Sequence, residues 1–324
     1  MKIKILLFIN VTLLITLIIF IFLYFNKDTS GNSKILRDQQ ESFALTNPIL
    51  DCENANQSNN PIISRFKIIK EVESLEETYN VNSISMYYRD LNDGPWIGIN
   101  EDEIFSPASL LKTPVAMALF KYAEDNPDIL NKKVLITEDD SNAQFNQNII
   151  FPGALEKGKE YSMLEAVESM IIRSDNIAVS VILKNIPESY IDGVFKSIGV
   201  PYKDVRNEVN LRVKDSAAFF RVLFNSSYLS REMSEKLLQM LSKSLYTGGL
   251  SSYTGEGVVV SHKFGERVIG SVYQLHDCGI VYYPNNPYLL CIMTKGDNFL
   301  KLQGVLKNLS KFVYQEVDKS IKGQ

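Results

Sequence analysis

Three short motifs in this chain bring together the side-chain types that acyl transfer to a serine requires. They are Ser109-Leu-Leu-Lys112, Ser174-Asp175-Asn176 and Lys263-Phe264-Gly265. A serine hydroxyl is a poor nucleophile until a nearby base takes its proton, and a lysine can be that base when burial or other cations favour its neutral amine. The only histidines are His262 and His276, which weakens the case for a Ser/His/Asp triad or a histidine-rich metal site. The order of the motifs predicts one pocket for acyl transfer.

The first motif is expected at the start of a helix. Residues 107–122 are apolar almost all round, which predicts a buried central helix that Pro107 suits as a start and Pro114 bends in its second turn. Ser109 and Lys112 are three residues apart and share one face. The amide of Ser109, at the helix start, can form half of an oxyanion hole. An amphipathic helix with an incidental serine and lysine is the alternative.

The second motif is expected at a break between two buried helices. Residues 161–172 predict a helix with Ser162 as N-cap and Glu165 completing a capping box, and a new apolar stretch follows the motif. In the functional interpretation Ser174 relays a proton to the leaving group, and Asn176 holds the substrate amide. A tight helix connection with ordinary capping residues is the alternative.

The third motif is expected on a β-strand. Residues 257–264 are rich in β-branched side chains, and Gly265 allows a ligand to approach the backbone closely. Lys263 can attract an anionic group of a substrate, while the amide of Glu266 can be the second oxyanion donor. A lysine that merely protects an edge strand from aggregation is the alternative.

Together the motifs resemble the S-x-x-K, S-D-N and K-T-G signature of the penicillin-recognising serine hydrolases, and most closely that of class A β-lactamases. The resemblance extends over roughly residues 61–320. It implies that Ser109 is the acylated nucleophile, Lys112 its base or proton shuttle, Lys263 the anion-binding residue, and Ser174 and Asn176 the opposite wall. Substrate binding is expected to involve Asn176, Phe264, Gly265 and Glu266. We expect neither a metal nor an organic cofactor.

Two departures from that signature bear on activity. Phe264 stands where the family has a hydroxyl residue, so a donor to the substrate carboxylate is missing, and Lys263 or Arg267 would have to replace it. In class A β-lactamases a glutamate on a long loop activates the deacylating water. Glu208 is either that base or a solvated loop carboxylate, and in the second case hydrolysis of a β-lactam acyl-enzyme is slow.

The N-terminus predicts a membrane anchor. Residues 5–25 are almost uninterruptedly apolar and follow Lys2 and Lys4, and a bilayer needs ~20 such residues. Because no small-residue cleavage site follows, we expect an uncleaved anchor over residues 1–26 rather than a signal peptide. The catalytic domain would then lie on the extracytoplasmic side of the cell membrane. Residues 27–60 are polar and predict a flexible linker.

Residues 61–324 predict one α+β domain of the β-lactamase/transpeptidase type. An antiparallel sheet flanked by helices would come from residues 61–105 and 235–324, with an all-helical lobe, 106–234, inserted between them. The site would lie between the lobes. The elements expected in the sheet lobe are hairpins over residues 83–99 and 278–294, the second turning at 284–287, and a closing helix over 299–317.

Composition excludes some alternatives. A net charge of −4 gives no basic footprint for nucleic-acid binding. The three cysteines lack metal-ligand spacing. Cys278 and Cys291 fall on neighbouring predicted strands, but a tight turn would leave them out of register, so we predict no disulfide.

The sequence therefore predicts a membrane-anchored serine amide hydrolase that forms an acyl-Ser109 intermediate with β-lactams. The alternative is a penicillin-binding D-alanyl-D-alanine peptidase acting on peptidoglycan. A third hypothesis is a non-catalytic receptor for β-lactams or muropeptides. The sequence does not indicate an oligomeric state.

Overall fold

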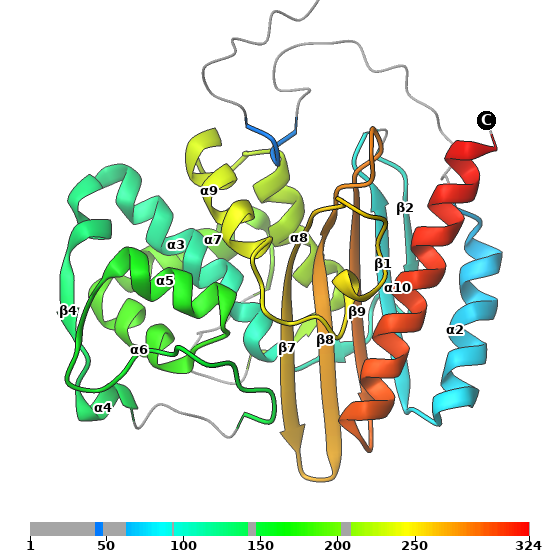
Figure 1. The fold of residues 1–324 in the computed structure, drawn as a ribbon, viewed down its shortest axis with the longest axis horizontal. Coiled ribbons are helices and arrows are strands. Elements are labelled where there is room, and N and C mark those ends of the chain that lie inside the picture. The colour runs from blue at the N-terminus through cyan, green and yellow to red at the C-terminus, as the bar shows by residue number, and fades with distance from the viewer. Residues whose placement is uncertain (1–42, 48–62, 93, 142–146, 202–208, 324) are drawn as a thin grey trace, which may run out of the picture. The chain divides into compact units, whose positions relative to one another are not determined.

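The computed structural model describes residues 43–47, 63–92, 94–141, 147–201 and 209–323 (Figure 1). The predicted anchor at residues 5–25 and most of the predicted linker lie outside these ranges. Among the helices that fall inside them, none is long and apolar enough to span a bilayer.

A five-stranded antiparallel sheet forms one half of the described domain, with strand order β2-β1-β9-β8-β7. Its strands are β1 (Ser83–Asp90), β2 (Trp96–Ile99), β7 (Val260–Ile269), β8 (Val272–Val281) and β9 (Tyr288–Gly296). Both predicted hairpins are present. The third motif lies on β7, as expected, although this strand starts three residues later and continues to Ile269. Because β7 is an edge strand, its free side is available to the catalytic motifs.

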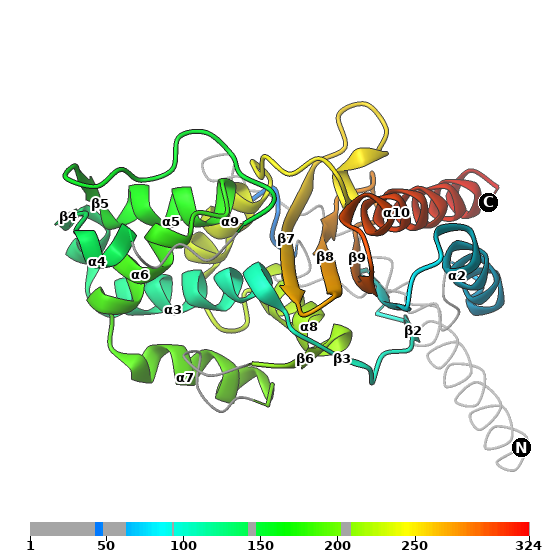
Figure 2. The ribbon, with the colours of Figure 1, turned by 90° about the horizontal axis from the view of Figure 1, so that it is seen from below.

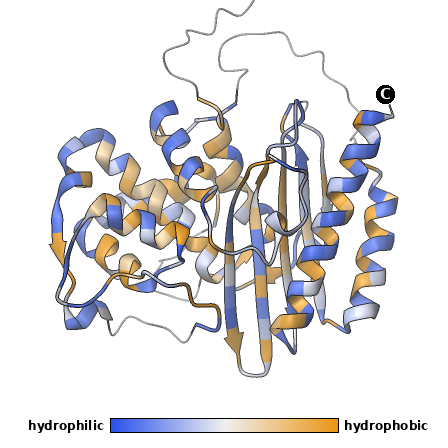
Figure 3. Cartoon of the chain, viewed as in Figure 1, coloured by the Kyte–Doolittle hydropathy of each residue, from blue (hydrophilic) through white to orange (hydrophobic). Residues whose placement is uncertain are grey.

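Helices cover both faces of the sheet, which explains why its strands are apolar on both sides. Helices α2 (Arg65–Tyr79) and α10 (Phe299–Lys322) pack on one face, and α8 (Val213–Phe224) packs on the other (Figures 1 and 2). On β9, Leu290 and Ile292 join the core under α10, whereas Leu289 and Met293 join the core under α8. Hydrophilic and hydrophobic stretches alternate along α2 and α10 (Figure 3), as expected for helices with one buried side.

The helical half contains the remaining helices, which pack around α3. Its helices are α3 (Lys112–Asp125), α4 (Glu138–Ser141), α5 (Met163–Ile172), α6 (Asn176–Asn185), α7 (Glu188–Ile198) and α9 (Arg231–Leu241). Two short ribbons accompany them, β3 (Ile104–Phe105) with β6 (Leu211–Arg212) and β4 (Lys133–Leu135) with β5 (Glu160–Ser162). The α+β class, with an antiparallel sheet, flanking helices and a helical lobe, is confirmed. The predicted lobe boundary at residue 234 falls inside α9.

Local sequence signals explain two helix starts. Helix α5 begins with the predicted capping box, in which Ser162 and Glu165 satisfy each other's backbone N–H groups. Helix α3 begins at Lys112, later than predicted, after a 3₁₀ turn, η2 (Ala108–Leu111). Pro114 is therefore the third residue of α3, where a backbone N–H has no partner within the helix in any case, rather than a bend in a second turn.

Residues 43–47, within the predicted linker, pack against the domain. The amides of Leu45 and Thr46 donate to the buried Glu235 carboxylate at 2.9 Å each, and Tyr282 donates to the Leu45 carbonyl at 3.0 Å. A buried carboxylate requires hydrogen-bond donors, and the segment supplies two of them to Glu235 on α9. The segment is therefore held in place.

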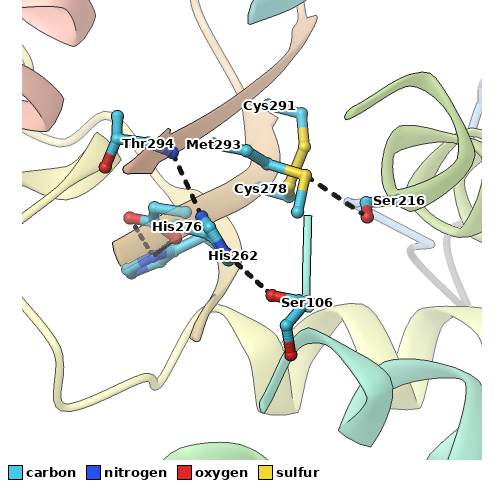
Figure 4. The surroundings of a disulfide bond; sticks show 9 residues. Ser106, Ser216, His262, His276, Cys278, Cys291, Met293 and Thr294 are labelled. Atoms are coloured by element: carbon cyan, nitrogen blue, oxygen red, sulfur yellow. Dashed lines mark hydrogen bonds and ion pairs between the residues drawn. A yellow bond between two sulfur atoms is a disulfide. The ribbon is translucent and has the colours of Figure 1, made fainter. Parts of the chain in front are cut away.

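The prediction of no disulfide was wrong, because the second hairpin turns differently from the tight turn expected. Its strands end at Val281 and Tyr288, which leaves a six-residue loop, 282–287, and brings Cys278 directly opposite Cys291. The Cα atoms of the two cysteines are 3.9 Å apart, and their sulfur atoms are bonded (Figure 4). With the turn at 284–287 that the sequence suggested, Tyr283 would lie opposite Tyr288, and Cys278 would lie opposite Met293, two residues beyond Cys291.

We predict that the unfolded protein exposes one thiol per chain without reductant and three after reduction, as counted by thiol titration. A double Cys278→Ser and Cys291→Ser variant should expose one thiol under both conditions. Because the bond closes a loop of 13 residues, this variant should also lose about 3 kcal/mol of unfolding free energy in urea titrations. Three thiols before reduction would contradict the pairing.

Candidate functional site

The site begins at the turn η2, which precedes α3 and carries Ser109. Ser109 is half-buried, whereas Lys112, the first residue of α3, is only 4 % exposed. Ala108, just before the serine, has a φ of 50°, a left-handed conformation that is uncommon for a residue with a side chain. Such strain costs on the order of 1–3 kcal/mol and persists only where the surroundings impose it.

The sheet holds this strained turn through Ser106. The Ser106 amide donates to Gln274 at 3.1 Å, and its carbonyl lies 2.9 Å from Nε2 of His276 (Figure 4). The Thr294 amide donates to Nδ1 of His276 at 3.2 Å, so the ring is neutral with its proton on Nε2. Burial lowers the pKa of His276 to about 4, in agreement with that assignment. Arg267 adds a bond to the Ser106 hydroxyl at 3.1 Å. The turn is therefore anchored from three side chains of β7 and β8.

Two buried lysines converge on the hydroxyl of Ser174. Lys112 Nζ lies 3.1 Å from Ser174 Oγ, and Lys263 Nζ, reaching from β7, lies 2.9 Å from the same oxygen. Lys112 also contacts the Ser174 carbonyl and donates to Asn176 Oδ1 at 2.7 Å. The structure thus brings together Lys112, Ser174, Asn176 and Lys263, which come from three distant parts of the sequence.

Burial controls the charge of both lysines. It lowers the pKa of Lys112 to about 7, against the opposing pull of the Asp175 and Glu266 carboxylates. Lys263 is fully buried, and burial together with the nearby Lys112 charge lowers its pKa well below the usual lysine range. A lysine with a pKa near neutrality is a competent general base for a serine hydroxyl at physiological pH.

Asp175 holds the second motif in place through its carboxylate. Its carboxylate accepts from the amide of Ile177 at 2.9 Å, capping α6, and from the amide of Leu155 and the hydroxyl of Ser169 at 2.8 Å each. Ser174 itself has a left-handed φ of 59°. Asp175 belongs to the second motif, but the sequence did not indicate its structural role. Its three partners are spread over 22 positions and form no local pattern.

Gly265 lets β7 approach the serine turn closely. A methyl group added there would lie 2.7 Å from the Pro107 carbonyl oxygen and 3.1 Å from the nitrogens of Ser109 and Leu110. A real side chain cannot occupy that space without moving the backbone. This contact places Glu266, the next residue of β7, beside the turn, where the amides of Ser109 and Glu266 were expected to act together.

The side chain of Glu266 has a structural contact that the sequence did not suggest. Its Oε1 accepts from the amides of Asn148 at 2.8 Å and Ile149 at 2.7 Å, while Oε2 is buried without a hydrogen-bond partner in the described part of the chain. Gln147, next to them, donates to the Ser174 carbonyl at 3.0 Å. Residues 147–149 therefore bridge β7 and the second motif.

Phe264 takes the sequence position of the family's hydroxyl residue, but its ring does not form an open wall of the pocket. Its ring is 1 % exposed, stacks on Tyr246 with centroids 4.3 Å apart, and meets Phe151 edge-on at 5.9 Å. The Lys263 ammonium lies 4.2 Å from the centre of the Phe264 ring and donates to the Phe264 carbonyl at 3.0 Å. The Phe264 ring is therefore not exposed to a ligand. Glu208, the candidate deacylation base, lies outside the described residues.

A family comparison agrees with this geometry. The model of the beta-lactamase enzyme family matches residues 67–317. The chain belongs to the beta-lactamase enzyme family. It is a serine hydrolase of the β-lactamase-like kind, within the penicillin-recognising superfamily that its three motifs resemble. A comparison with curated protein sequences gives no significant match.

Solved structures of the family share the fold. A variant of PBP-A, determined as an acyl-enzyme complex with penicillin-G, superposes with a TM-score of 0.67 at 22 % identity over 80 % of this chain and 99 % of that chain. The β-lactamase from Sphaerobacter thermophilus gives 0.67 at 18 % identity over 79 % and 98 %. The TLA-3 extended-spectrum β-lactamase gives 0.68 at 15 % identity over 78 % and 98 %. At these identities the likeness concerns the fold.

Substituting Gly265 should disable the site while leaving the fold intact. We predict that Gly265→Ala slows acylation by a β-lactam at least about 100-fold, because the added methyl group displaces β7 from the Ser109 amide. Mass-spectrometric acylation rates and thermal unfolding measure the two effects.

The matched control is Gly193→Ala in α7, where the added methyl group meets only the Tyr228 hydroxyl, at 3.4 Å. It should leave acylation unchanged. Equal rates for Gly265→Ala and the unmodified protein would contradict a close approach of β7 to the turn.

Proposed function

We propose that the protein is acylated on Ser109 by β-lactams and releases the product slowly. The observation that carries this proposal is the convergence of two buried lysines, Lys112 and Lys263, on the Ser174 hydroxyl beside the serine turn. Support also comes from PBP-A, a protein of the same fold that has been captured as an acyl-enzyme with penicillin-G.

In the proposed acylation, neutral Lys112 takes the proton of Ser109 as its oxygen bonds to the β-lactam carbonyl carbon. The amides of Ser109 and Glu266 hold the negative charge that develops on the carbonyl oxygen. The carbon–nitrogen bond then breaks, and the proton passes from Lys112 through the Ser174 hydroxyl to the leaving nitrogen. Lys263 orients Ser174 through its 2.9 Å contact, and Asn176 holds the amide of the substrate.

Slow release is expected because the carboxylates nearest to Lys112 already accept hydrogen bonds from the protein backbone. Asp175 and Glu266, the carboxylates whose charges act on Lys112, each accept backbone N–H groups. The Oε2 atom of Glu266 has no hydrogen-bond partner among the described residues, but it is buried away from solvent. A carboxylate that activates water must instead accept a proton from it. We therefore propose that the acyl-enzyme persists, and that the domain works on the outer face of the cell membrane with residues 5–25 as its anchor.

A second candidate is a non-catalytic receptor for β-lactams or muropeptides. The burial of the Phe264 ring favours it, because this position supplies no hydroxyl donor for the carboxylate of an incoming ligand. A D-alanyl-D-alanine peptidase would use the same Ser109 chemistry on peptidoglycan. Turnover of a D-Ala-D-Ala peptide separates this activity from the others.

Intact-mass spectrometry of the full-length protein after addition of penicillin-G tests the proposal. We expect an adduct with the mass of the intact drug that persists for hours, is absent in Ser109→Ala and is retained in Ser227→Ala, a matched change of an exposed serine on the helical half. An adduct that clears while the drug is hydrolysed would overturn slow release. Reversible binding without an adduct would overturn acylation and leave the receptor.

The acylation rate should rise with pH through about 7, since Lys112 must be neutral to accept the proton and its pKa lies there. Below that pH the ammonium form dominates, and the rate should fall about tenfold per pH unit. Adduct formation measured between about pH 5 and pH 9 gives the profile, and Lys112→Ala should remove both the rate and its pH dependence. A flat profile in the unmodified protein would exclude Lys112 as the base.

A further inference from the structure

A cavity of about 240 Å³ lies between helix α8 and strands β1, β2 and β9. It is remote from the motifs along the sheet, because β1 and β2 form the opposite side of the strand order from β7, which carries Lys263. We call it the α8–β1 pocket. Its walls combine two aromatic rings, Tyr87 and Trp96, with three cationic side chains, Arg89, Lys214 and Arg221.

Helix α8 supplies one wall through its regular spacing. Lys214, Ala218 and Arg221 follow one another at intervals of four and three residues, so they lie on the same side of the helix. The short side chain of Ala218 leaves space between the two cations. The opposite wall is a diagonal pair across the β1–β2 hairpin, in which the rings of Tyr87 and Trp96 stack with centroids 5.6 Å apart.

The charge of the pocket is unbalanced. None of its lining residues is acidic. Lys214 is bonded to Asp102, but neither Arg89 nor Arg221 forms an ion pair with any residue in the described ranges. Both arginines are half-buried, and the chain as a whole is negatively charged. Cations gathered without carboxylates repel one another, and a bound anion would offset that repulsion.

We propose that the α8–β1 pocket binds a small organic anion, in which a carboxylate or phosphate contacts Arg89 and Arg221 and an attached ring packs against Tyr87 and Trp96. Guanidinium groups match the geometry of both oxyanions. Aromatic walls with a few converging polar groups are typical of ligand sites, and a cavity of about 240 Å³ has room for one ring rather than for a polymer. The site does not depend on the chemistry of Ser109.

Trp96 provides the measurement, because it is the only tryptophan of the chain and is 51 % exposed. Fluorescence of the full-length protein is titrated with N-acetylmuramic acid and with glucose 6-phosphate, two ring-bearing anions. The two comparators are N-acetylglucosamine, which has the ring but no anionic group, and inorganic phosphate, which is an anion without a ring. At least one ring-bearing anion should give a saturable change with about tenfold or greater preference over both comparators, and whichever binds identifies the oxyanion. Thermal-shift titrations follow the same ligands without relying on fluorescence.

Three variants locate the binding. Arg89→Gln and Arg221→Gln should each weaken it about tenfold or more, and Ala218→Leu should block it by filling the cavity without changing any charge. Lys307→Gln removes an exposed charge from α10, on the other face of the sheet, and should leave the affinity unchanged. The proposal is overturned if fluorescence and thermal shift both show no binding of either ring-bearing anion. It is also overturned if a comparator binds as tightly as the ring-bearing anions, or if all three pocket variants bind with the affinity of the unmodified protein.

Discussion

The burial of two lysine side chains against one serine hydroxyl is the constraint on which the rest of this structure depends. An ammonium group removed from water costs several kcal/mol unless it is paired, and two of them in one place also repel each other. The Ser174 hydroxyl cannot neutralise either lysine. The carboxylates of Asp175, Glu266 and Asp277 act on them from nearby and raise their pKa values, but burial outweighs this effect. The protein therefore keeps Lys112 as an amine that releases its proton near neutrality, which is the property that acyl transfer needs.

Such an arrangement persists only because each contributing element is fixed independently. The turn before α3 is held through Ser106, and the second motif is held by the Asp175 carboxylate. Strand β7 is fixed from behind, where His262 contacts Asp277 at 2.9 Å and Asp277 accepts the amide of Leu250 at 2.8 Å. Neither histidine therefore serves as a catalytic base in the described contacts, and both support the backbone that carries the lysines. The rigidity of the site comes from buried polar groups whose partners lie on other elements.

The sequence predicted those parts of the structure that are encoded locally. The capping box of α5, the β1–β2 hairpin and the closing helix need only spacing and turn residues, and all three are present. The register predicted for the second hairpin was wrong, because the loop is two residues longer than the four-residue turn expected. The longer loop places Cys278 opposite Cys291. The contact of Glu266 with Asn148 and Ile149 had no signal, since backbone amides more than a hundred residues away leave no pattern in the sequence.

Two residues of β7, Phe264 and Glu266, act on the same lysine, Lys263. In the family signature a hydroxyl follows the lysine and helps to hold an anionic substrate. Here the ring of Phe264 lies 4.2 Å from the Lys263 ammonium, and the face of an aromatic ring stabilises a cation. The Glu266 carboxylate also favours the charged form of Lys263. The protein itself thus already supplies part of the stabilisation that a bound anion would give to the positive charge of Lys263. A substrate carboxylate gains correspondingly less on binding here, so the reacting amide and the oxyanion donors must contribute a larger share of recognition than in a site whose lysine waits for an anion.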